Sequence, residues 1–173
     1  MAAGQTYTSI ASQTLSSAAA SVTFSSISGA YTDLILIANV YGSANDVGFS
    51  VTFNSDTGAN YSNTSILSRG NAVETNRASG VNKIVLYGYN YGSGSTNNIF
   101  SPVVFSLMNY SNATTYKTIL GRSFCQRNDG SGETYAKVGL WRNTAAITSM
   151  NLFLDSGNIE INSTFSLYGI LAA

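Results

Sequence analysis

The chain contains no histidine, one cysteine and one proline, and charged residues make up only 9% of it. Without histidine, neither a Ser-His-acid triad nor a Cys-His pair can form, and the usual imidazole ligands of zinc are missing. The single thiol, Cys125, cannot close an internal disulfide, so we expect it to be buried as a small apolar residue. We therefore expect a protein that is not an enzyme, with no catalytic residues, no bound metal and no cofactor.

Charge is scarce and balanced. Eight basic and eight acidic residues cancel, the isoelectric point is about 6.1, and the basic residues are scattered along the chain. Nucleic-acid binding needs a dense basic face, so nucleic acid is not an expected partner. The longest purely apolar run, Leu34 to Ala38, is too short to cross a bilayer, so no membrane contact is expected either. Low charge leaves little repulsion between copies and favours self-association.

The remaining polar groups offer only weak catalytic or metal-binding alternatives. A Ser-Lys dyad is open in principle, with Lys83, Lys117 and Lys137 as its only lysines, but no spacing favours it. Most carboxylates lie in or beside turns, which argues against the paired acids of a glycosidase. The segment Asp129 to Glu133 resembles part of a calcium loop, yet it lacks the alternating acidic ligands of an EF-hand and is better interpreted as a hairpin turn.

The chain does have abundant period-two patterning, with strand-like segments separated by clusters of Gly, Asn, Ser and Asp. No linker or charge block divides it, so residues 1–173 are expected to form a single β-sandwich domain. The expected strands lie at Thr6 to Ala11, Ala20 to Ile27, Tyr31 to Tyr41, Val47 to Asn54, Asn82 to Tyr91, Ile99 to Met108, Tyr116 to Cys125, Thr134 to Arg142, Ile147 to Leu154 and Ile159 to Leu171.

Three of these segments are informative about their surroundings. Val47 to Asn54 alternates strictly, which predicts one buried face and one solvated face. Tyr31 to Tyr41 and Ile99 to Met108 are apolar on both faces, which is typical of interior strands or of strands covered by a neighbouring subunit. Because proline has no amide donor, Pro102 predicts an edge or a bulge at its own position.

About ten short antiparallel strands in one domain must double over or close to bury their apolar faces. The sequence therefore predicts an all-β fold, an antiparallel two-sheet sandwich of jelly-roll type. A closed barrel is the alternative.

A row of tyrosines is the one candidate contact site. Tyr87, Tyr89 and Tyr91 occupy alternate positions of one predicted strand and so share a face. Tyrosine combines apolar area with a hydroxyl group, which suits either a glycan or a protein interface. The alternative is that the three rings fill a core between sheets or between subunits.

Four ordered segments carry a resemblance to a known family. They are Ser21 to Ile27 running into Ala30 to Leu34, Phe53-Asn54-Ser55 followed by Asn60-Tyr61-Ser62, Gly139 to Ser149, and Ser163 to Ile170. Within the third segment, Asn143 and Thr144 predict the turn of a hairpin. Together the four segments resemble a family of small virion proteins of tailed bacteriophages, described as structural, head-decoration or fibre-associated.

The resemblance implies a location on the virion surface, after synthesis in the host cytoplasm and release by lysis. It favours a capsid decoration or cement protein, which would act as a homotrimer bound to the major capsid protein or another virion protein. The alternative is a head-fibre, tail-fibre or tail-associated module that binds a host surface glycan. A polysaccharide depolymerase is the third and least favoured hypothesis.

Overall fold

A computed structural model describes residues 6–44, 47–90, 99–126 and 132–171. The described residues form strands and no helix, so none of them belongs to a helix long and apolar enough to cross a membrane. The strands are β1 (Tyr7–Thr14), β2 (Ser21–Phe24), β3 (Asp33–Val40), β4 (Val47–Phe53), β5 (Tyr61–Arg69), β6 (Ala72–Val81), β7 (Ile84–Asn90), β8 (Ser101–Leu107), β9 (Lys117–Gln126), β10 (Gly132–Trp141), β11 (Met150–Leu154) and β12 (Thr164–Ile170).

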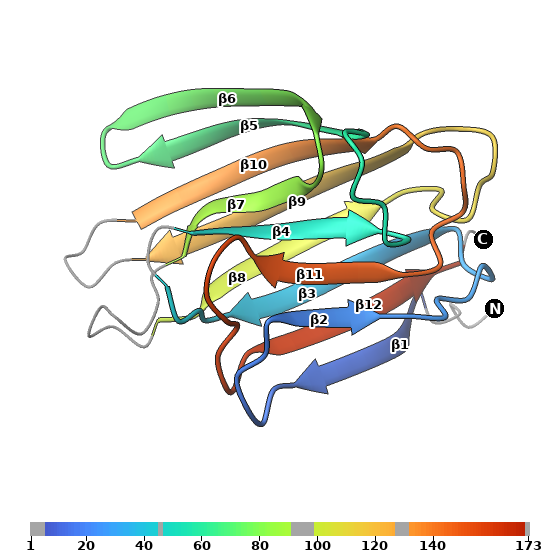
Figure 1. The fold of residues 1–173 in the computed structure, drawn as a ribbon, viewed down its shortest axis with the longest axis horizontal. Coiled ribbons are helices and arrows are strands. Elements are labelled where there is room, and N and C mark those ends of the chain that lie inside the picture. The colour runs from blue at the N-terminus through green and yellow to red at the C-terminus, as the bar shows by residue number, and fades with distance from the viewer. Residues whose placement is uncertain (1–5, 45–46, 91–98, 127–131, 172–173) are drawn as a thin grey trace.

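The strands form two antiparallel sheets that pack face to face (Figure 1). The larger sheet has eight strands in the order β1-β12-β3-β8-β9-β10-β5-β6, and the smaller has four in the order β2-β11-β4-β7. Within this arrangement, β1-β12-β3-β8 and β2-β11-β4-β7 are the two halves of a jelly roll, in which the chain crosses repeatedly between sheets. The hairpins β5–β6 and β9–β10 are insertions that widen the larger sheet. The predicted jelly-roll sandwich is therefore confirmed.

The core lies between the two inner faces. Every second residue of each covered strand points inward and is almost fully buried, as strand geometry requires. The rings of Phe49 on β4 and Phe165 on β12 meet across the interface with centroids 6.3 Å apart. The other main contributors are Val22, Leu34, Leu36, Val51, Phe105, Leu152 and Leu167. Burial of these side chains is what stabilises the two layers against each other.

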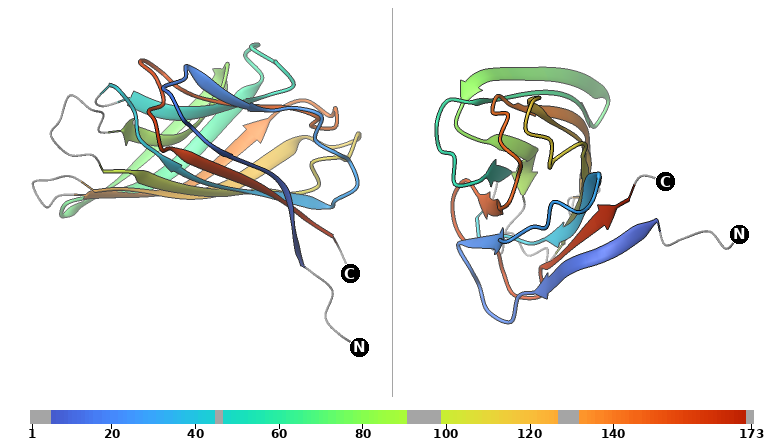
Figure 2. Two further views of the ribbon diagram at one scale, coloured as in Figure 1. Left: turned by 90° about the horizontal axis from the view of Figure 1, so that it is seen from below. Right: turned by 90° about the vertical axis from the view of Figure 1, so that its right-hand side faces the viewer.

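The two sheets differ in width, and this shapes the molecule. Four strands cover only part of an eight-stranded sheet, so β5 and β6 extend beyond the smaller sheet and curl over it (Figure 2). The curl places the inner face of this hairpin opposite the segment that enters β7. A hollow remains there, which is described below.

The predicted count of about ten strands was too low, because β5 and β6 were missed. Nearly all of β6 is exposed, so it carries no buried alternation that could have revealed it. Pro102 was placed correctly at a local edge: it pairs with Asn39 on β3, whereas pairing of β8 with β9 starts only at Val103.

The predicted solvated face of β4 was wrong. Ser50 is fully buried, because Asp155 folds over this face and accepts a hydrogen bond of 2.7 Å from the Ser50 hydroxyl. Lys83 holds the Asp155 carboxylate in this position through an ion pair of 2.8 Å. Polar contacts of Asp155 and Lys83 thus bury a face of β4 that the alternating sequence pattern assigns to solvent.

Gly139 provides a test of how tightly β7 packs on β10. A Cβ atom built at this position would lie 2.7 Å from Cγ2 of Ile84 and 2.8 Å from Cγ1 of Ile119, both in the core. We expect Gly139→Ala to lower the free energy of unfolding by about 1–3 kcal/mol through overpacking. Gly29→Ala is the control, because its Cβ would meet only Ser111 Cβ at 3.6 Å. Urea unfolding of both variants measures the difference, and equal stability would contradict the packing described.

Candidate functional site

The tyrosine row can be placed only in part. Tyr87 and Tyr89 lie in β7, the edge strand of the smaller sheet, where Tyr87 pairs with Phe49 of β4. Their side chains and the whole of Tyr91 lie outside the described part of the structure. The row remains a prediction.

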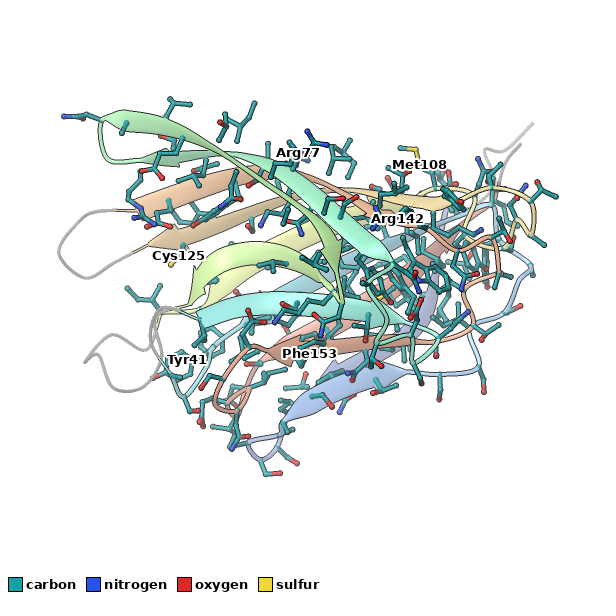
Figure 3. The ribbon with its side chains drawn as sticks, turned by 45° about the horizontal axis from the view of Figure 1, so that its top comes forward. Tyr41, Arg77, Met108, Cys125, Arg142 and Phe153 are labelled. Atoms are coloured by element: carbon teal, nitrogen blue, oxygen red, sulfur yellow. The ribbon has the colours of Figure 1, made fainter. Side chains whose placement is uncertain are left out.

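Two of the four segments that carry the family resemblance meet at one end of the sandwich. The rings of Phe53, Tyr61 and Trp141 are mutually in contact, with centroids 5.7–6.4 Å apart, and all three are fully buried. We call these three rings the aromatic cluster. Figure 3 shows Arg142, the residue after Trp141, among the densely packed side chains of this end, and Cys125 toward the opposite end. Cys125 is buried, as expected.

Asp56 connects the aromatic cluster to its loop. One carboxylate oxygen accepts a hydrogen bond of 2.7 Å from the Trp141 indole, and the carboxylate also accepts hydrogen bonds from the Asn60 amide and the Gly58 backbone. Desolvation alone would raise the pKa of Asp56, but these donors outweigh it and lower the pKa below its ordinary value. The carboxylate is therefore a structural acceptor and not a proton donor.

The neighbouring loop is held by side chains that bond to backbone. Asn54 donates to the Ala146 carbonyl at 2.7 Å and accepts from the Thr148 amide at 2.8 Å. Arg142 donates to the Tyr61 carbonyl at 3.0 Å. The predicted hairpin at residues 143–144 was wrong, because this segment links β10 of the larger sheet to β11 of the smaller one. Ile147, expected to start a strand, is instead buried in the crossing and bonded to the Tyr110 carbonyl.

The remaining two segments also contact each other. The ring of Tyr31 lies directly over Gly169 of β12, where any Cβ would come within 2.6 Å of ring atoms. The glycine is thus required by close packing. The residues of these segments named above therefore act in packing and in hydrogen bonds within the scaffold.

The Asp56 carboxylate gives a stability prediction. Asp56→Ala leaves the Trp141 indole without its acceptor beside a buried cluster, so we expect a loss of about 2–3 kcal/mol in the free energy of unfolding. Wild-type stability should also fall as pH drops through the lowered pKa of Asp56, and this dependence should weaken in the variant. Urea unfolding at pH 7 and at pH 2, well below the ordinary pKa of 3.8, measures both effects. An unchanged midpoint at pH 7 would contradict the assigned role.

A second feature is a pocket of about 370 Å³ under the curled hairpin. Its floor is the inner face of β10, β5 and β6, and its wall is the segment from Val81 to Val85 that leads into β7. Strand register gives the floor a defined order. Lys137 of β10 lies opposite Ser65 of β5, which lies opposite Asn76 of β6. These three residues are called the pocket row.

Ion pairs flank the pocket row. Glu133, only 1% exposed, forms an ion pair with Arg69 at an Nε–Oε1 distance of 2.7 Å and accepts a hydrogen bond from the Tyr135 hydroxyl. Burial and the adjacent Glu133 raise the pKa of Tyr135. On the opposite wall stands the pair between Lys83 and Asp155. This small region thus contains several of the chain's few charged groups.

Lys137 differs from the other two lysines. Lys83 has its ion pair, and Lys117 Nζ donates to the Thr115 and Thr144 carbonyls at 2.6 and 2.9 Å. Lys137 is 6% exposed, and within the described residues it has neither an ion pair nor a hydrogen bond; its ammonium lies 5.5 Å from the centroid of the Tyr135 ring. Desolvation lowers the pKa of Lys137 to about 8, although the charge of Asp155 opposes the shift.

The Ser-Lys alternative can now be examined directly. Ser65 and Lys137 occupy opposing register positions, but no hydrogen bond joins the Ser65 hydroxyl to the Lys137 ammonium. In the part of the chain that the structure describes, no group of three or more His, Cys, Asp or Glu side chains is placed to hold a metal ion. Among the described residues, the pocket therefore shows no hydrogen-bonded Ser-Lys pair.

A third feature is the outer face of the larger sheet. Its exposed side chains include Ile37 of β3, Leu120 and Phe124 of β9, Val138 of β10, Ile66 of β5 and Val73 of β6. Leu120 and Val138 are direct cross-strand partners. The two strands predicted to be apolar on both faces, β3 and β8, lie inside this sheet, each between two neighbouring strands. Among the described residues, the smaller sheet covers their inner faces and no layer covers their outer faces.

The comparisons with known proteins add no identity. A search of protein-family models finds none that matches the chain, and no curated protein or solved structure matches it.

Lys137 produces a measurable pH dependence. Between about pH 8 and 10 the unfolded chain keeps a proton that the folded chain has released, because the ordinary lysine pKa is 10.5. Stability should therefore rise by about 2 kcal/mol across this window. Above about pH 10 stability should fall again, because Tyr61 ionises at its ordinary pKa of 10.0 in the unfolded chain but keeps its proton up to about pH 12 in the folded one. Urea unfolding at pH 7, 8, 9 and 10 should show the rise in the wild type and not in Lys137→Met, and parallel curves would refute the assignment.

Proposed function

We propose that this chain is a non-enzymatic structural protein of a tailed-phage particle, which decorates the capsid and cements its shell. The outer face of the eight-stranded sheet is its docking surface. The resemblance of the scaffold segments to small phage virion proteins supports a location on the phage particle. The exposed apolar side chains of the sheet support its use as a binding surface. Jelly rolls occur in viral capsid proteins, although fold alone does not decide function.

The observation that carries this proposal is the apolar character of an open sheet face. An antiparallel sheet with one solvated face normally presents polar side chains there. Here Leu120 is 55% exposed and Ile66 is 56% exposed, on strands separated only by β10. Covering one half-exposed leucine contributes about 1 kcal/mol, so several such residues on every copy would supply useful adhesion.

The polar residues of this face favour an acidic partner. Arg122 of β9 lies in the same cross-strand row as Ile66, and Arg77 of β6 lies in the row of Leu120 and Val138. The acidic side chains of β10 and β6, Glu133 and Glu74, line or flank the pocket on the other face. A shell surface with apolar patches and carboxylates would complement this arrangement.

Cementing then works by mass action. A subunit that binds only the assembled lattice stabilises that lattice against expansion and internal pressure. A homotrimer or another small ring would multiply the contacts of each docking event. The free edges of the larger sheet, β1 and β6, each pair with one neighbour only among the described strands and are available for contacts between copies.

The second candidate is a fibre or tail-associated module that binds a host surface glycan. It is favoured by the pocket, whose asparagine and lysine side chains suit polar ligands. A depolymerase is less well supported, since two of the three carboxylates near the pocket, Glu133 and Asp155, are held in ion pairs. Copy number separates the first two: a cement protein is present in hundreds of copies per particle and a fibre in tens or fewer.

The test substitutes one residue of the docking surface. Leu120→Asp places a charge on the exposed face without touching the core, so the fold should be retained while binding to stripped particles falls at least about tenfold. Ser21→Asp is the matched control, because Ser21 is an exposed strand residue of the smaller sheet. Co-sedimentation with particles measures binding, and the temperature of DNA release measures cementing.

Particles that carry the wild-type protein or the Ser21→Asp control should release DNA at a higher temperature than stripped particles. If Leu120→Asp and Ser21→Asp bound stripped particles equally well, the outer face of the larger sheet would not be the docking surface. A release temperature that does not respond to the protein would refute cementing. Steady release of reducing sugar by the purified protein would favour the enzyme instead.

A further inference from the structure

Lys137 presents a positive charge to the pocket without a partner of its own. Its long side chain rises from β10, where the same-face neighbours along the strand are Tyr135 and Gly139. Among the carboxylates near the pocket, Glu133 is paired with Arg69 and Asp155 with Lys83, and Glu74 lies two strands away from Lys137 on β6. Burying a charge without a counter-ion is costly, so an ammonium kept in a cavity of ligand size points to an anion from outside.

The groups around the ammonium define the rest of the ligand. Asn63, Asn76 and Asn82 line the pocket from β5, β6 and the turn before β7, and Ser65 lies between Lys137 and Asn76 in the pocket row. A carboxamide both donates and accepts hydrogen bonds, and so does a hydroxyl. Several such side chains in one hollow match a ligand that carries several hydroxyl groups, each of which also donates and accepts.

We infer that the pocket beneath the β5–β6 hairpin binds a carboxylated sugar residue, with the carboxylate on Lys137 and the hydroxyl groups on the flanking asparagines. A volume of about 370 Å³ accommodates one such residue and lies at the small end of ligand pockets. This site is separate from the outer face of the sheet, so it stands or falls independently of cementing.

The charges around the ligand set the direction of each substitution. Lys137 attracts the carboxylate, and Glu74, which lines the pocket from β6 without an ion pair among the described residues, repels it. Arg69, Lys83, Glu133 and Asp155 are held in their two pairs, and Tyr135 lies beneath the ammonium. Removal of Lys137 should weaken binding, and removal of the Glu74 charge should strengthen it.

The experiment titrates the purified full chain with D-glucuronate, D-glucose and acetate, followed by calorimetry or by NMR. Glucuronate should bind more tightly than either of the others, because only it satisfies both the ammonium and the amides. Lys137→Met should reduce glucuronate affinity by roughly tenfold or more, which is the loss of one charge-assisted contact. Ser21→Asp is the matched control, because it changes the net charge by the same one unit at an exposed residue of the smaller sheet and should leave affinity unchanged.

Two further variants protect the test against a folding failure. Asn76→Ala lies on the exposed strand β6 and should lower affinity several-fold without loss of the fold. Glu74→Gln should raise affinity. Glucuronate affinity should also fall as pH rises through about 8, where the lysine loses its proton.

Three results would overturn the inference. The first is no detectable glucuronate binding at millimolar concentration. The second is equal affinity in the wild type and Lys137→Met. The third is acetate binding as tight as glucuronate, which would show a simple anion site without sugar recognition.

Discussion

The packing of a four-stranded sheet on an eight-stranded one is the constraint on which the rest of the structure depends. Where the two sheets overlap, apolar side chains from both inner faces interlock, as the contact between Phe49 and Phe165 shows. Where the smaller sheet ends at β7, the larger one has no second layer, so β10, β5 and β6 must satisfy their inner face differently. They do so with polar side chains and two ion pairs around a hollow. The pocket is therefore a direct result of unequal sheet width.

Much of the fold could be predicted from alternation, and the failures have physical causes. Strands β3 and β8 have strong apolar periodicity on their covered inner faces, and their positions were predicted closely. The last strand was also predicted, but β12 starts at Thr164 and not at Ile159. β6 has almost no buried residue, and its partner β5 reads Ser-Asn-Thr-Ser over most of its first half. A strand held mainly by backbone hydrogen bonds to one neighbour leaves little trace in the hydrophobic pattern. Ser50 was wrongly assigned to solvent for a different reason: Asp155, which covers it, is 105 residues away in the sequence.

The candidate site was harder to predict than the fold. Alternation along β10 does contain a signal, because Lys137 shares the parity of Tyr135 and Trp141, which are core residues. A lysine at a core-facing position of a strand marks a buried charge. That signal can be used only once it is known which face of β10 points to the core. The apolar residues Ala136 and Val138 lie on the other face, so the sequence alone would favour that face as the buried one. The pocket row also required the register of β5 and β6, which were not predicted at all. The tyrosine row had a clearer pattern in the sequence, yet its side chains lie outside the described residues.

The position of β12 determines when the chain can fold. This strand, formed near the C-terminal end of the sequence, lies between β3 and β1 and pairs with both. β1 has no other partner among the described strands, so it cannot join the sheet until β12 has been translated. During that interval the apolar edge of β3 is exposed too, and sheets built from such distant pairings form slowly. The low charge of the chain offers little protection against aggregation in this interval, so rapid translation or a chaperone would matter more for yield than the stability of the finished sandwich.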